Sequence, residues 1–201
     1  MSLVKEEQVS KVLTRGLTPK QLTMSRTTLK KAIKDFDADE LRQLIMDVYT
    51  RSKEAREILD FYAVPDIAAK REQIEKPIVK ELTRRYKGSP KPRFTRIKAQ
   101  IKRFANLDVG DQAVASLMGF VVLESVKNCG DGSYLSDATL SAIVKFFGET
   151  IDFMLPRLLL EEWQPQFEKA INNMPSRRFF KNPLQTAMLE VIREKTREAE
   201  V

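Results

Sequence analysis

Apolar residues recur at helical spacing along the whole chain, and this periodicity constrains the fold more than any other feature of the sequence. Leu41, Leu44, Ile45 and Val48, for example, fall on one helical face. We find no run of alternating, β-branched residues bounded by turns, which is the pattern of a strand. The sequence therefore predicts an all-α fold of about eight to ten helices, either a multi-helix bundle or an irregular, HEAT-like stack of α-hairpins.

Several of these helices have recognisable starts. Asp37 is followed three residues later by Glu40, which predicts a capping box. Asp111 is expected to cap a helix that is apolar on most sides and therefore central, and Ser136 to cap the next one. Pro77 is expected to kink or divide its helix.

The clearest interruption of the helical pattern is "KGSPKPR" at residues 87–93, where glycine and two prolines stand among charges. This linker predicts an N-terminal helical part, residues 1–87, and a C-terminal helical part, residues 93–201. Residues 4–14 are expected to form the first helix. One continuous domain with a shared core is equally compatible with the pattern.

The chain of 201 residues contains no histidine and one cysteine, Cys129. These counts exclude a structural zinc site, a Ser-His-Asp or Cys-His nucleophile and a histidine general base. Carboxylate, Lys, Tyr, Ser or Cys chemistry remains open, but no catalytic motif is present and we assign no catalytic residue, metal or cofactor. A single cysteine cannot form an intrachain disulfide, and no apolar run approaches the ~20 residues of a membrane span. The expected location is the cytoplasm.

The positive charge of the protein is concentrated in one segment. The formal net charge is +7, yet residues 76–104 contain eleven Lys and Arg and a single acid, Glu81, for a net charge of +10. The remainder of the chain is therefore mildly acidic, with a net charge of −3. Such a local concentration of charge indicates a surface for an anionic partner more specifically than a high overall pI does.

If residues 76–87 are helical, four of these cations form a stripe opposite the apolar face. The next helix, starting near Arg93, would surround its apolar face with further cations. The candidate partner-binding residues are Lys76, Lys80, Arg84, Lys87, Arg93, Arg96 and Arg103.

The first functional hypothesis is a non-enzymatic binding or scaffold protein that presents this surface to an anionic partner, with nucleic acid as the named candidate and an acidic protein or an anionic membrane surface as others. A solvated face, or one neutralised by acids from elsewhere such as Glu161 and Glu162, is the alternative reading of the segment. The second hypothesis is a structural or regulatory module that oligomerises through its C-terminal apolar helices and has no nucleic-acid role.

Two other motifs are less specific. In "SRRFFK", at residues 176–181, two arginines precede two phenylalanines, which indicates either a ligand-binding lip or an inter-helix loop docked into the core. "GDGS", at residues 130–133, lacks the glycine and glutamate of a calcium loop and the lysine of a phosphate loop. It is interpreted as a turn.

The stretch "TTLKKAIKDFDADELRQLIMDVYTRSKEAREILDFY", residues 27–62, resembles an uncharacterised bacterial family known only as a domain of unknown function. "IKAQIKRFANL" and the apolar helix after Asp111 are compatible with the same family, so the likeness covers most of residues 27–155. The resemblance implies an all-helical fold. It implies no activity and no site residue, because the family has none assigned.

Overall fold

The computed structural model of the protein describes residues 25–175 and 182–199. The helix expected over residues 4–14 and the motif at residues 176–181 lie outside them. The chain forms two compact units, Met1–Leu59 and Asp60–Val201, so the division falls inside a helix. In the described part of the chain, every helix is too short or too polar to span a bilayer.

The first unit contains α2 (Arg26–Ala32), α3 (Ala38–Arg51) and the beginning of α4 (Lys53–Ala63). The predicted capping box at the start of α3 is confirmed. The Asp37 carboxylate accepts the Glu40 N–H at 2.8 Å, and the Glu40 carboxylate accepts the Asp37 N–H at 2.9 Å. None of the described residues of these three helices is buried. The helices are thus defined locally, by their caps and backbone hydrogen bonds, and not by a core among the described residues.

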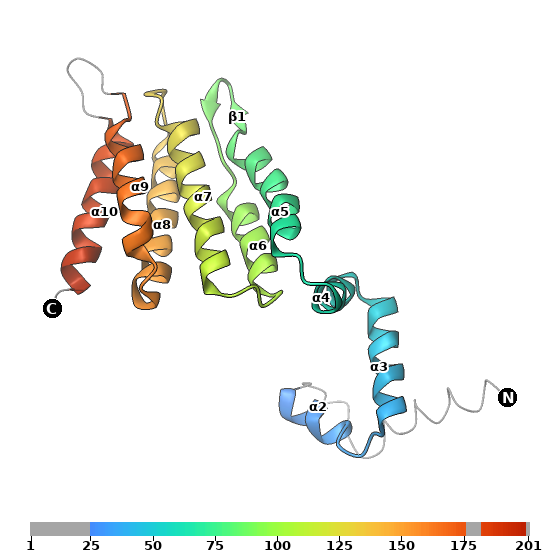
Figure 1. Ribbon diagram of the computed structural model, residues 1–201. Coiled ribbons are helices and arrows are strands. Elements are labelled where there is room, and N and C mark those ends of the chain that lie inside the picture. Colours follow the sequence, from blue (N-terminus) through green and yellow to red (C-terminus); the bar gives the residue numbers. More distant parts are fainter. Residues whose placement is uncertain (1–24, 176–181, 200–201) are drawn as a thin grey trace. The chain divides into compact units, whose positions relative to one another are not determined.

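After the end of α4, the described residues of the second unit form an up-and-down series of α-helices (Figure 1). These are α5 (Ile67–Leu82), α6 (Phe94–Ala105), α7 (Asp111–Cys129), α8 (Asp137–Met154), α9 (Leu160–Asn172) and α10 (Pro183–Ala199). Each helix packs against the next one along the chain, with the exception of α8 and α9. A short 3-10 helix, η2 (Leu155–Arg157), connects these two. The packing of α5 on α7, of α7 on α9 and of α8 on α10 also joins alternate helices.

This pattern is a stack of three α-hairpins, with α5, α7 and α9 in one layer and α6, α8 and α10 in the other. The all-α prediction is confirmed, and its HEAT-like alternative describes the second unit. The described residues contain nine α-helices, within the expected range.

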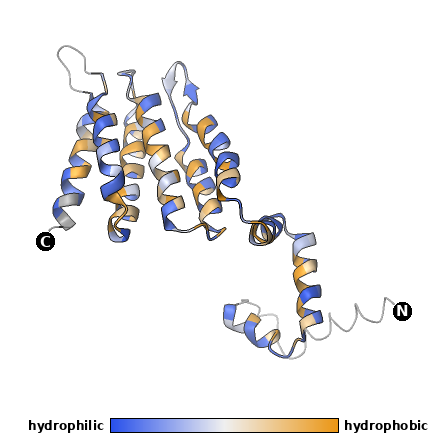
Figure 2. Cartoon of the chain, in the orientation of Figure 1, coloured by the Kyte–Doolittle hydropathy of each residue, from blue (hydrophilic) through white to orange (hydrophobic). Residues whose placement is uncertain are grey.

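The predicted central position of α7 is confirmed by its burial. This helix contacts both layers and buries residues on nearly every side, among them Val114, Leu117, Val121 and Val126. In Figure 2, hydrophobic and hydrophilic residues alternate along the helices of the second unit, in agreement with the helical spacing of the apolar residues. The C-terminal apolar residues that suggested an oligomerisation surface are thus largely used within the core of this unit.

The helices α7 and α9 approach one another closely at Gly119. The indole ring of Trp163 lies where a Cβ atom on Gly119 would stand. Trp163 also lies beside Phe167, with 5.8 Å between ring centroids, and Phe167 meets Phe147 edge-on at 5.4 Å. A residue without a side chain at position 119 therefore lets α9 pack against the central helix.

The expected cap of α7 is wrong, and of the two outcomes expected at Pro77, division of the helix is excluded. Pro77 does not divide α5, which runs through it, because Ile74, Ile78 and Leu82 hold the apolar face of the helix in the core on both sides of the proline. Asp111 is not the cap of α7. Gly110, with a φ of 86°, precedes the helix, and Asp111 is its first residue, where its carboxylate accepts a hydrogen bond from Arg157.

The predicted linker at residues 87–93 adopts a different structure from the one expected. Residues 85–90 form a small antiparallel hairpin of two strands, β1 (Arg85–Tyr86) and β2 (Ser89–Pro90). The hairpin joins α5 to α6, which pack closely on one another, so both sides of it belong to the same unit. The boundary between the two compact units lies between Leu59 and Asp60.

Candidate anion-binding site

The site begins where α5 ends. The N–H and the hydroxyl of Thr83 both donate to the Val79 carbonyl, at 2.9 Å each, and thereby satisfy the last turn of the helix. The chain then enters β1, reverses at Lys87 and Gly88, and returns along β2. The φ angles of these two residues are 48° and 83°, which is the sign pattern of a type I′ turn, the two-residue turn that suits the twist of a hairpin.

This hairpin is fixed to the end of α7 by Arg85. The Arg85 guanidinium donates to the carbonyls of Gly88, at 3.0 Å, and Asn128, at 3.4 Å, and lies 3.5 Å from the Asp131 carboxylate. Hydrogen bonds from Ser133, and then the Arg85 charge, hold the pKa of Asp131 below its ordinary value, so this carboxylate remains charged. Because Pro90 is also buried, the hairpin has a defined orientation on the second unit.

Several predicted cations are already paired. Lys76 lies 3.0 Å from Glu72, and Arg103 also has a partner. Arg93 donates twice to the Glu81 carboxylate, at 2.5 and 2.8 Å, and Arg96 lies 3.4 Å from the same group. The hydrogen bonds from Arg93 are the main cause that holds the pKa of Glu81 below its ordinary value.

The single acid of the basic segment is thus the ion-pair partner of two of the seven candidate residues and offsets one of their two charges. Lys98, another cation of the segment, reaches across to Glu149 on α8.

The predicted four-residue stripe is wrong in its second half. Since α5 ends at Leu82, Arg84 and Lys87 do not continue the helical register of Lys76 and Lys80. They belong to the hairpin and its entry, together with Lys91, which the stripe did not include. Sequence reasoning missed Lys91 because it assigned residues 88–92 to a linker.

The hairpin brings together cations that have no carboxylate partner. Arg84, Lys87 and Lys91 form no ion pair with any of the residues that the structure describes. The Arg84 carbonyl accepts the Lys91 N–H at 2.8 Å, which places these two residues side by side at the base. Tyr86, 55 % exposed, lies between the lysines, with the Lys87 and Lys91 ammonium groups 5.7 and 4.8 Å from its ring centroid. We call Arg84, Tyr86, Lys87 and Lys91 the hairpin patch.

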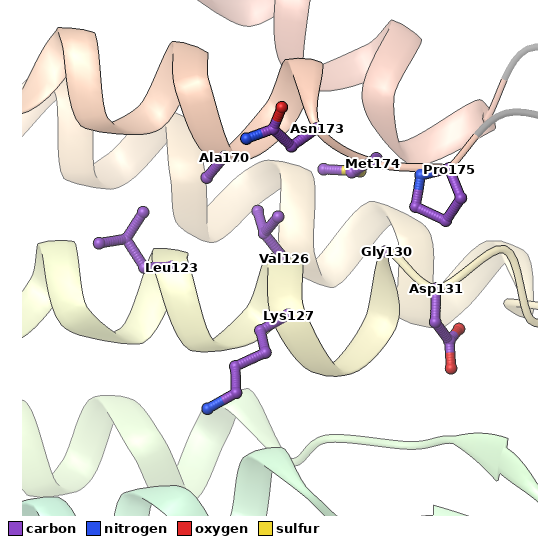
Figure 3. Close-up of a pocket in the computed structure, with 9 residues that line it drawn as sticks. All are labelled: Leu123, Val126, Lys127, Gly130, Asp131, Ala170, Asn173, Met174 and Pro175. Carbon is purple, nitrogen blue, oxygen red and sulfur yellow. The ribbon is translucent and has the colours of Figure 1, made fainter.

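A pocket near the hairpin has fewer charged and polar groups in position to bind a ligand. It has a volume of about 440 Å³ and lies between the C-terminal ends of α7 and α9. Figure 3 shows Leu123 and Val126 pointing toward Ala170 and Met174, whereas Lys127 and Asp131 point away from this lining. Among the described residues, the lining of the pocket therefore lacks the convergent polar groups that orient a small ligand.

A comparison with protein-family models places residues 24–192 in a family of unknown function, DUF6155. The chain belongs to this family. The match includes α2, α3 and α4 as well as the stack, so both units are part of what the family shares. No curated protein and no solved structure matches the chain.

Because this family has no assigned function, the chemistry of the site is inferred from its side chains alone. Within residues 25–175 and 182–199, no three metal-ligating side chains gather into a group that could hold an ion. At the "GDGS" turn, the Asp131 carboxylate accepts the Ser133 N–H at 2.9 Å, in agreement with the turn interpretation. Cys129 is buried, and burial raises the pKa of its thiol to about 11, which makes it a poor nucleophile.

Proposed function

We propose that this protein is a non-enzymatic binding or scaffold protein, and that the hairpin patch is the centre of a basic surface that it presents to nucleic acid. The observation that carries the proposal is the contrast within the basic segment. Arg93, Arg96 and Lys98 have carboxylate partners, whereas the cations of the hairpin patch have none among the described residues. Lys80, on the last turn of α5, is likewise unpaired there and extends the surface.

The backbone at Lys87 supports the same proposal. A left-handed φ costs a residue with a side chain roughly 1–2 kcal/mol, and type I′ turns usually place Asn, Asp or Gly at this position. Lys87 adopts this conformation with a φ of 48°. A strained position at an exposed tip is a typical place for a residue retained for binding. Phosphate groups are suitable partners because their contacts with Lys and Arg release bound counterions.

The experiment is a salt titration of the full chain with labelled single-stranded RNA and labelled duplex DNA, followed by fluorescence anisotropy. If three cations contact phosphates of a duplex, the logarithm of the affinity falls with the logarithm of the salt concentration with a slope of about −2.7. This slope corresponds to a loss of roughly 40-fold between about 50 and 200 mM salt.

The variant for this test is Arg84→Gln, Lys87→Asn, Lys91→Gln. Asparagine at position 87 keeps the turn, because it tolerates a left-handed φ better than lysine does. We expect this variant to lose most of the affinity and most of the salt dependence while it remains folded.

A control variant removes the same number of charges elsewhere. Lys145→Gln, Lys169→Gln, Arg197→Gln changes three exposed residues on α8, α9 and α10. It should retain the binding of the wild-type protein. Equal losses in both variants would indicate attraction by net charge alone, and absence of binding at low salt would refute the nucleic-acid proposal. Binding to an acidic polypeptide such as polyglutamate, but to neither nucleic acid, would point to an acidic protein.

A further inference from the structure

The helix α3 has an apolar face that nothing in its own unit buries among the described residues. Leu41, Leu44, Ile45 and Val48 share a wedge of about 100° around the helix axis. Ile45 is 49 % exposed and Val48 is 42 % exposed, and Leu41 and Leu44 are only half-buried. A helix of 14 residues is marginal on its own in water, so an amphipathic helix of this length needs a surface to cover its apolar face.

Two residues of opposite charge stand beside this face, one near each end of the helix. Glu40 and Arg51 are eleven residues apart, so they lie on the same flank of the stripe, about 20° from one another around the axis and near opposite ends of the helix. Arg51 has no ion pair within the described part of the chain. Among the described residues, the Glu40 carboxylate accepts only the N–H of Asp37, so it too is available to a cation.

We propose that α3 pairs with α3 of a second copy of this chain in an antiparallel, two-fold symmetric contact. When the two helices are centred between Leu44 and Ile45, Leu44 of one copy lies opposite Ile45 of the other, and Leu41 lies opposite Val48. All four apolar residues of each helix therefore lie opposite apolar residues of the other helix. A two-fold contact repeats every such pair in both directions.

The antiparallel direction follows from the charges. In an antiparallel pair, each flank of one helix meets the same flank of the other, so Glu40 of one copy meets Arg51 of the second copy, twice. In a parallel pair, each flank would instead meet the opposite flank of the partner, so Glu40 of one copy could not meet Arg51 of the other. This contact is independent of the hairpin patch and of the function proposed for it, since it uses other residues and another unit.

The test is the oligomeric state of the full chain, measured by sedimentation equilibrium over a range of concentrations. We expect a reversible dimer. Glu40→Lys alone and Arg51→Glu alone should each weaken it about tenfold or more, because two attractive contacts become two repulsive ones.

Mixing the two variants distinguishes a second copy from any other occupant. In the mixed dimer, the lysine introduced at position 40 of one chain meets the glutamate introduced at position 51 of the other, and the remaining Glu40 meets the remaining Arg51. Both contacts are attractive again, so the dimer should return to near wild-type strength. This rescue also controls for the loss of the capping box in Glu40→Lys, because the mixture retains that loss. A monomer at all concentrations, or a dimer that neither variant weakens, would overturn the proposal, as would weakening without rescue in the mixture.

Discussion

The close contact of Trp163 with Gly119 predicts that Gly119→Ala changes the free energy of unfolding in the opposite direction from an ordinary glycine-to-alanine substitution in a helix. Alanine in place of a glycine inside a helix normally stabilises a protein by about 0.5–1 kcal/mol, because it removes backbone freedom from the unfolded chain. At Gly119, however, the added methyl group would overlap the indole of Trp163. Overpacking of this kind typically costs about 1–3 kcal/mol. We therefore expect Gly119→Ala to destabilise the protein.

Gly148 provides the matched control. It lies inside α8, as Gly119 lies inside α7, but an added methyl group there would meet only Val191, at 3.8 Å, an ordinary contact. Gly148→Ala should therefore stabilise the protein by about 0.5–1 kcal/mol. The gain from replacing a helical glycine by alanine is common to both variants. The difference between their free energies of unfolding therefore measures the cost of displacing Trp163, about 1–3 kcal/mol.

The assay is urea unfolding of both variants and the wild type, followed by far-UV circular dichroism and by the fluorescence of Trp163, the only tryptophan. Gly119→Ala should also change the emission of the folded state, because the indole must move. The reasoning is refuted if Gly119→Ala is as stable as Gly148→Ala, or if the emission of its folded state is unchanged.

Two further predictions concern titratable groups. The thiol of Cys129 is buried, and its pKa of about 11 keeps it protonated. It should therefore not react with a disulfide reagent at pH 8 in the folded protein, but should react fully in urea. Rapid reaction of the folded protein would contradict this burial. Glu81 has a folded-state pKa below its unfolded-state value, so its pair with Arg93 stabilises the protein above about pH 4.5 and loses this effect as the pH falls further. Glu81→Gln should therefore be less stable than the wild type at pH 7 and approach it toward pH 3 in urea unfolding, and a difference that is constant across this range would count against the pairing.

The features that the sequence predicted well are those with local causes. The capping box of Asp37 and Glu40 depends on atoms three residues apart, and the cap of α8 at Ser136 accepts the N–H of Thr139 in the same way. The central place of α7 follows from the fact that its residues are apolar on most sides of the helix. Family membership was likewise visible in the capping and packing pattern of residues 27–62.

The features that the sequence did not predict depend on contacts between distant residues or on unusual backbone. Strands of two residues have no measurable periodicity, and a turn with lysine in the left-handed region lacks the Asn-Gly or Asp-Gly signal of a hairpin. The pair of Lys98 with Glu149 joins residues 51 positions apart, so the neutralisation of part of the basic segment could not be read from the sequence. The candidate site therefore remains a prediction in the same segment, but its composition changed from a helical stripe to a hairpin.

The up-and-down order of the stack separates its two ends. The C-terminal ends of α5, α7 and α9 lie at the same end of the stack, which also carries the hairpin patch (Figure 1). Changes in the length of the links that follow these helices are inexpensive, since doubling a flexible loop costs only about 0.6 kcal/mol. A change in the length of a link at this end would therefore leave the layered core of the second unit unchanged.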